Sequence, residues 1–148
     1  HAGEFAKSGE FSGTAAYAGK VLGMVMKDEA PVLILADYHG GTKNNAGSGL
    51  FHMGAFKCNF TVEVVQMPQT ESTGYCTFFD ADGDTMIQRG EIEGSLGGPS
   101  EGIATFVHGT GKYEGITGDV VWNISPLPSA EQNTFQGWIS FSGSYQLP

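Results

Sequence analysis

The chain has 148 residues, 40% of them hydrophobic, and a net charge of −9 from 16 acidic and 7 basic residues. This length suits a single domain over residues 1–148, and the hydrophobic content argues against disorder. The acidity argues against binding of nucleic acid or anionic membranes, which needs clustered lysine and arginine; no apolar run approaches a membrane span.

The first third of the chain predicts two strands, over residues 10–17 and 31–38. The second is β-branched and leucine-rich. Between them, residues 19–30 are equally compatible with a short helix or a strand. Residues 39–48 are polar and rich in glycine, which predicts a mobile loop.

The longest strand signal covers residues 50–65. Apolar residues alternate there with polar ones, and this period of two is typical of a half-buried antiparallel strand. Leu50, His52, Phe56, Cys58 and Phe60 fall on its apolar face. Further strands are predicted over 74–79 and 85–93.

Two later strands, over 103–108 and 119–125, flank a segment with four glycines, residues 109–118. Glycine adopts positive φ freely, so this segment predicts a tight connection. Its Gly-Thr-Gly-Lys run lacks the remaining residues of a phosphate-binding loop. The last strand, over 135–147, has bulky residues and glycines on one face.

About eight strands at hairpin spacing, with small glycines on inward faces, predict a closed antiparallel β-barrel. A barrel of this size has room for one small ligand. The alternative is a two-sheet β-sandwich.

Three stretches carry a family resemblance: the 109–118 turn, the hairpin from Tyr75-Cys76 to residues 80–84, and the terminal residues 142–148. They resemble small bacterial proteins similar to the allene oxide cyclase and dirigent barrel superfamily. The resemblance covers mainly residues 55–148 and implies a barrel, cyclase or radical-steering activity, and a homodimer or homotrimer. No family catalytic residue matches a position here.

Cys58 and Cys76 lie 18 positions apart on neighbouring predicted strands. If the two strands form a hairpin, the side chains meet across it and can form a disulfide; two buried thiols are the alternative. A bridge favours a periplasmic or secreted protein, and free thiols a cytoplasmic one. His1 is compatible with a processed N-terminus or with the remnant of a tag.

Residues 80–91 place carboxylates at the first, third, fifth and twelfth positions of a calcium loop. The sixth position is Thr85 instead of glycine and the flanking segments read as strands, so a hairpin turn is favoured. The four histidines lack the spacing of a zinc site. An N-terminal copper site at His1 is a remote alternative, and we predict neither a metal nor another cofactor.

His52 and Gln88 are polar residues predicted to face the barrel interior. Such groups in an apolar pocket can orient a ligand. Alternatively, they are core residues whose hydrogen bonds are satisfied within the protein. His52 is the candidate for proton transfer. The remaining candidate ligand contacts are aromatic or lie near strand ends: Tyr38, Phe56, Phe60, His108, Phe141 and Tyr145.

These features predict a protein that binds a small lipophilic molecule inside the barrel. The activity we expect is isomerisation, cyclisation or elimination driven by orientation and exclusion of water. The alternatives are a non-catalytic carrier with the same cavity, because fold does not determine function, and a partner-binding module with a filled core.

Overall fold

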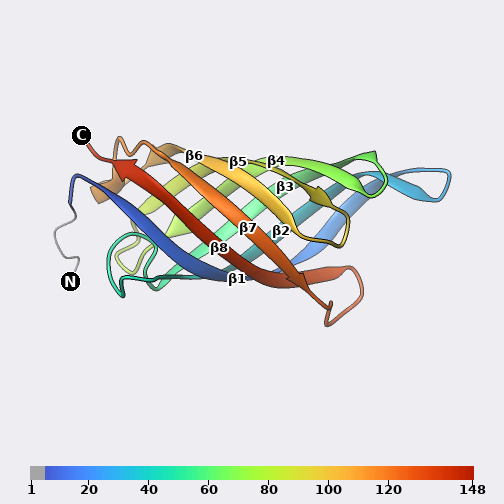
Figure 1. Cartoon of the computed structure of the whole chain (residues 1–148), viewed down its shortest axis with the longest axis horizontal. Coiled ribbons are helices and arrows are strands. Elements are labelled where there is room, and N and C mark those ends of the chain that lie inside the picture. The colour runs from blue at the N-terminus through green and yellow to red at the C-terminus, as the bar shows by residue number, and fades with distance from the viewer. Residues whose placement is uncertain (1–5) are drawn as a thin grey trace.

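The computed structural model describes residues 6–148, which form a closed barrel of eight antiparallel strands. Each strand pairs with the next along the chain, and β1 also pairs with β8 (Figure 1). The predicted barrel is confirmed, and the sandwich alternative is wrong because the sheet closes on itself. The strands are β1 (Ser8–Lys27), β2 (Ala30–Asn44), β3 (Gly54–Gln66), β4 (Gln69–Phe79), β5 (Thr85–Ser95), β6 (Ser100–Gly109), β7 (Asp119–Leu127) and β8 (Thr134–Gln146).

The ambiguous segment 19–30 is strand, so the helical alternative is wrong. From Gly13 to Lys20, β1 pairs with β8 on one side and β2 on the other; beyond Lys20 its ladder continues with β2, as far as Lys27. Shifts in register after Val21 and Val25 mark bulges in this second half. The β1–β2 hairpin consequently extends beyond the other strands (Figure 1).

The predicted loop 39–48 is a strand as far as Asn44. Gly40 and Gly41 lie in the ladder between β1 and β3, opposite Phe56 and Ala55 of β3. A side chain at position 40 would run into the backbone of Ala16, so glycine lets the strands approach here. Glycine at this position marks close packing of strands and not a loop.

The predicted strand 50–65 begins only at Gly54, because residues 50–53 form a turn. Thr42 Oγ1 donates a hydrogen bond of 2.6 Å to the Phe51 carbonyl, and Asn44 Nδ2 donates one of 2.7 Å to the Leu50 carbonyl. Phe51 has φ of 63°. These bonds fold Leu50 and Phe51 inward, where both are buried.

Aromatic rings lie over glycines on the inner wall. A Cβ on Gly13 would approach the Phe141 ring to 2.6 Å, and one on Gly19 would approach the Phe135 ring to 2.7 Å. The missing side chains leave the space that the rings occupy, so the barrel accommodates a large aromatic core. The inward glycines predicted from the sequence therefore have a packing role.

The two ends of the barrel differ. At one end lie the first described residues, the C-terminus and the β2–β3, β4–β5 and β6–β7 connections (Figure 1). We call it the capped end, because Leu50, Phe51, Tyr113, Ile116 and Leu147 are buried there. The opposite end, ringed by four strand hairpins, is the mouth.

Cys58 and Cys76 face each other directly across β3 and β4 and form a disulfide, which confirms that prediction. Both residues are buried on the inner wall. No helix within residues 6–148 is long and apolar enough to cross a membrane.

Candidate functional site: a pocket at the mouth of the barrel

The mouth holds a pocket of about 130 Å³. Its wall draws on strands from around the barrel and is almost entirely apolar, with hydroxyl groups as its polar atoms. Because hairpins and not folded loops surround this end, the pocket opens toward solvent. It is lined by Tyr17, Ala36, Tyr38, Phe60, Val62, Ser72, Ile92, Ser100, Ile124, Phe135 and Ile139.

Tyr17 and Tyr38 are the two tyrosines that line this pocket. Their ring centroids lie 5.6 Å apart. Burial raises the pKa of both hydroxyls, and for Tyr38 the nearby Tyr17 adds to the effect. Neither hydroxyl bonds to another of the described residues. Both are thus neutral donors without an acceptor among residues 6–148.

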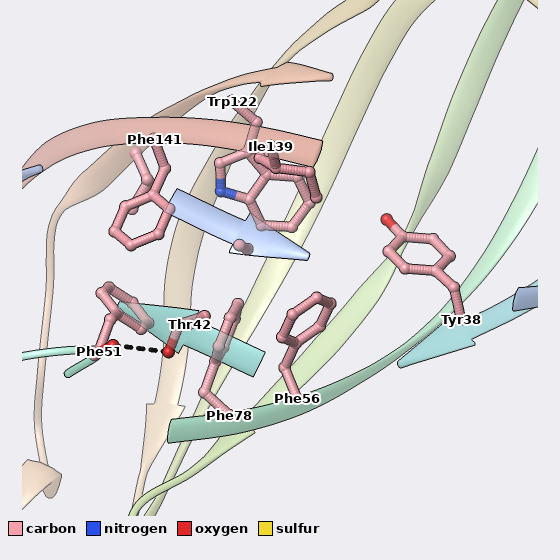
Figure 2. Close-up of a pocket in the computed structure, with 10 residues that line it drawn as sticks. Tyr38, Thr42, Phe51, Phe56, Phe78, Trp122, Ile139 and Phe141 are labelled. Atoms are coloured by element: carbon pink, nitrogen blue, oxygen red, sulfur yellow. Dashed lines mark hydrogen bonds between the residues drawn. The ribbon is translucent and has the colours of Figure 1, made fainter. Parts of the chain in front are cut away.

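A second, smaller cavity of about 20 Å³ lies deeper in the barrel, toward the capped end. Figure 2 shows the rings of Phe51, Phe56, Phe78 and Phe141 around it. Thr42 is its polar neighbour, and its hydroxyl already donates to Phe51. A small cavity with such walls stays dry.

Tyr38 separates the two cavities, since it lines both of them together with Ile139. Its ring stacks on Phe60 at 5.7 Å and lies edge-on to Phe56 at 6.4 Å. Of the aromatic residues predicted to contact a ligand, Phe60 lines the mouth pocket, whereas Phe56 and Phe141 line the deeper cavity.

Gln88 faces the interior, as its strand pattern predicts, and its side chain is fully buried at 0% exposure. It lies opposite Cys76 on β4 and Phe106 on β6. Within residues 6–148, neither its Nε2 nor its Oε1 has a hydrogen-bond partner. Gln88 is outside the walls of both cavities.

Three predicted site residues lie away from the interior pockets. His52 belongs to the 50–53 turn and not to a strand face, because β3 starts after it. His108 is exposed. The register of β5 and β6 shifts between Ile87 and Gln88, so His108 pairs with Ile87 and lies on the outer wall. The Tyr145 hydroxyl donates to the Ala6 carbonyl at the capped end, at 2.8 Å.

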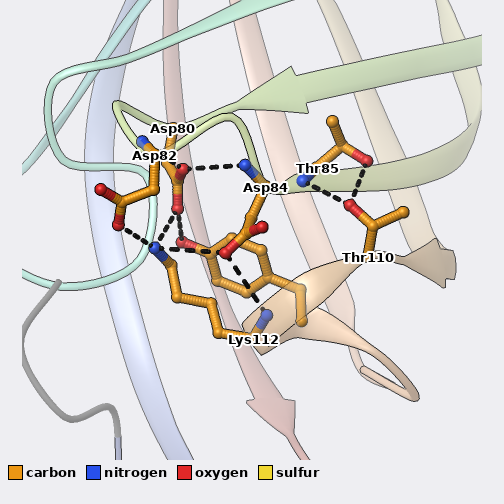
Figure 3. Close-up of polar contacts among 7 residues, drawn as sticks. Asp80, Asp82, Asp84, Thr85, Thr110 and Lys112 are labelled. Atoms are coloured by element: carbon orange, nitrogen blue, oxygen red, sulfur yellow. Dashed lines mark hydrogen bonds and ion pairs between the residues drawn. The ribbon is translucent and has the colours of Figure 1, made fainter.

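The acidic segment 80–84 is the β4–β5 turn, as favoured from the sequence. Figure 3 shows the Lys112 ammonium between its three aspartates, with Nζ 2.6 Å from Asp80, 2.7 Å from Asp82 and 3.6 Å from Asp84. The Tyr113 hydroxyl also donates to Asp80, at 2.8 Å. The carboxylates thus surround a lysine from the glycine-rich 109–118 segment.

This arrangement sets the charges of the turn. Burial opposes ionisation of Asp80, but hydrogen bonds from Lys112 and Tyr113 outweigh it and lower its pKa. Burial likewise opposes the charge on Lys112, and the bonds to Asp80 and Asp82 raise its pKa regardless. A calcium ion would have to displace the ammonium, so the residues present do not fit the calcium alternative.

Among residues 6–148, no group of three or more histidine, cysteine or acidic side chains is arranged to hold a metal ion. His1, the residue of the copper hypothesis, lies outside the described residues.

Sequence reasoning missed much of the mouth pocket. Tyr17, Phe135, Ser72 and Ser100 all line it, and none was a candidate. Their inward alternation was visible in the sequence. The stagger of the strands around the barrel decides which inward residues lie at the same height along its axis. The alternation in the sequence does not contain this stagger.

No family model and no curated protein matches the sequence. Among solved structures, the chain is similar to a protein described as the pterocarpan synthase dirigent protein GePTS1. The alignment covers 98% of this chain and 92% of that one, at 10% sequence identity and a TM-score of 0.43. At these values the similarity assigns no ligand, activity or site residue to this chain.

Proposed function

We propose that the protein binds one small, neutral and largely apolar molecule in the mouth pocket. The observation that carries this proposal is an apolar pocket lined by two tyrosines whose hydroxyls have no acceptor among residues 6–148. Binding sites for small molecules are typically apolar with a few converging polar groups. The mouth pocket has that composition.

The volume limits the group that enters. A dry cavity of about 150 Å³ holds benzene, so a pocket of about 130 Å³ takes one ring or a short branched chain. The rest of a larger ligand would project through the mouth. An oxygen on the bound group would accept hydrogen bonds from Tyr17 and Tyr38.

Calorimetric titration with 4-iodophenol tests this proposal. Ser72→Phe places a ring in the pocket and should abolish binding, whereas Ser140→Phe makes the same change on the exposed outer face of β8 and should not. Tyr17→Phe and Tyr38→Phe should each lower the affinity for 4-iodophenol by about fivefold, because a neutral hydrogen bond contributes about 1 kcal/mol. The affinity for iodobenzene, which lacks the hydroxyl, should not change. Equal binding by the two serine variants would refute the site.

A second candidate is a cofactor-independent isomerase, cyclase or lyase acting in the same pocket. The neighbouring tyrosine rings, 5.6 Å apart, favour it, since two phenol donors that reached one substrate oxygen would stabilise negative charge developing there during reaction. His52 is outside the pocket walls, so in this candidate Tyr17 and Tyr38 act as hydrogen-bond donors, and the proton transfer suggested for His52 has no part. Turnover of an epoxide or polyene that falls in Tyr38→Phe while affinity persists would distinguish this enzyme from a carrier.

The Cys58–Cys76 bridge supports an oxidising location. We propose that the protein acts in the periplasm or outside the cell. Alkylation of thiols in material taken directly from the native source tests this: modification of Cys58 without prior reduction would contradict it.

A further inference from the structure

A row of four glutamates crosses the outer wall of the barrel. Glu63 pairs with Glu71, Glu71 with Glu93, and Glu93 with Glu101, so each carboxylate lies directly opposite the next on strands β3 to β6. All four are exposed. None of the ion pairs found among residues 6–148 involves them.

This glutamate row opposes the stability of the sheet, because like charges directly opposite each other on neighbouring strands repel. Acidic residues dispersed over the surface would make the protein soluble without this repulsion, so solubility alone does not explain the row. The alignment of Glu63, Glu71 and Glu93 instead concentrates negative potential along one line.

A groove of about 510 Å³ runs beside the glutamate row on the same wall. Leu22 and Leu35 stand at one end and Tyr75 further along, and these side chains are 55%, 43% and 54% exposed. The remaining walls are Ala36, Asn59, Phe60, Thr61, Thr73, Gly74 and Arg89.

The strand register fixes how the groove and the row lie together. Leu35 pairs with Thr61, and Thr61 with Thr73, so this part of the groove crosses the strands in the same direction as the row. Glu63 and Glu71 are each two residues from these threonines, a separation of about 7 Å along a strand. An apolar surface therefore lies alongside a line of carboxylates.

We propose that this wall docks a basic, amphipathic segment of a partner protein, with apolar side chains in the groove and lysine or arginine against the glutamate row. Charge complementarity identifies this occupant. A nucleic acid or an anionic membrane would be repelled by the carboxylates, whereas a segment with apolar side chains on one face and basic side chains along the edge of that face satisfies both surfaces. The groove and the mouth pocket share Ala36 and Phe60 in their walls, but the other residues of the groove do not line the pocket.

A synthetic amphipathic helical peptide with five leucines on one face and five lysines beside them, acetylated and amidated, tests the proposal by fluorescence anisotropy with a rhodamine label. We expect saturable binding that weakens as salt rises. The same peptide with serine in place of leucine should bind at least tenfold more weakly, because only the leucines can enter the groove. Equal binding of the two peptides, or no saturation, would overturn the proposal.

Matched variants separate docking from general attraction to an acidic protein. The triple variant Glu63→Gln/Glu71→Gln/Glu93→Gln should bind the leucine–lysine peptide about tenfold more weakly. The control neutralises the same number of exposed carboxylates away from the row, as Glu10→Gln/Glu114→Gln/Glu131→Gln, and should change affinity less than twofold. Similar losses in both triple variants would show unspecific attraction and refute the site.

A second matched pair of variants tests the apolar groove. Leu35 lies in the groove and Leu127, of similar exposure, lies outside it on β7. Leu35→Ser should weaken the peptide by about fivefold and Leu127→Ser should not. Binding of 4-iodophenol should persist in Leu35→Ser, so failure of the docking proposal is distinguishable from failure of the pocket proposal.

Discussion

The ring of Phe60 lies against Gly74 on the inner wall: a Cβ built on Gly74 would be 2.7 Å from Phe60 Cγ and would also meet the Asn59 carbonyl. Gly74→Ala should therefore lower the free energy of unfolding by about 2 kcal/mol, because neither the ring nor the backbone can yield easily. Urea denaturation measures the change.

Gly41→Ala is the control for that experiment. Gly41 is exposed, also lies in a strand, and a Cβ there would have its nearest neighbour at 3.6 Å, an ordinary contact. Its effect should stay within about 0.5 kcal/mol. If both variants lose the same stability, the loss comes from replacing glycine in a strand and not from the ring.

Replacing Gln88 with methionine should stabilise the protein. The buried carboxamide has no partner among the described residues, and an unsatisfied buried polar group costs about 1 to 3 kcal/mol. Methionine has a similar shape and no such requirement, so Gln88→Met should raise the midpoint of urea denaturation. A lower midpoint would mean that the amide is satisfied in solution by water or a ligand.

Removing the disulfide should be costly. Cys58→Ala/Cys76→Ala removes a cross-link between residues 18 positions apart. The chain-entropy model gives a loss of about 3 kcal/mol in the free energy of unfolding for a loop of this size. The comparison is urea denaturation of this double variant and the oxidised protein. A difference below about 1 kcal/mol would show that the unfolded chain is already restricted at this hairpin.

The Lys112 network predicts a dependence of stability on pH. Because the pKa of Asp80 is lower in the folded state, its contribution is complete above the ordinary aspartate pKa of about 3.9. It is lost as pH falls through the lowered folded value. Lys112→Met should cost about 1 kcal/mol at neutral pH, and the difference from wild type should shrink below about pH 4.

Lys43→Met serves as the control for this network. Lys43 is exposed on β2 and belongs to none of the ion pairs found among residues 6–148. Its removal should leave stability nearly unchanged across the same pH range. A Lys112→Met curve parallel to wild type at acid pH would contradict the role assigned to the Asp80 carboxylate.

Local alternation favoured the barrel and the disulfide, but it left the β-sandwich and two buried thiols open as alternatives. The inner faces of β3 and β8 carry their bulky residues at a period of two, and Cys58 and Cys76 meet because both follow it. Glycines were ambiguous, since the same residue type ends a strand in one context and makes room for a ring in another. Gly40 and Gly41 were assigned to a loop for this reason.

Contacts between distant segments could not be predicted. Leu50 and His52 continue the alternation of β3, yet Thr42 and Asn44 of β2 draw this stretch into a turn. The partner of the 80–84 turn, Lys112, lies about thirty residues away. A period in the sequence says which way a side chain faces, but not which side chain it meets.

We expect the mouth pocket to take an apolar group beside Tyr17 and Tyr38. A crystal soaked in 4-iodophenol tests it most directly, because anomalous scattering locates iodine without ambiguity. We predict one iodine peak inside the wall formed by Phe60, Ile92 and Phe135, with the ligand hydroxyl within hydrogen-bond distance of a tyrosine. Iodine bound only on the outer surface, with the pocket empty, would contradict the claim.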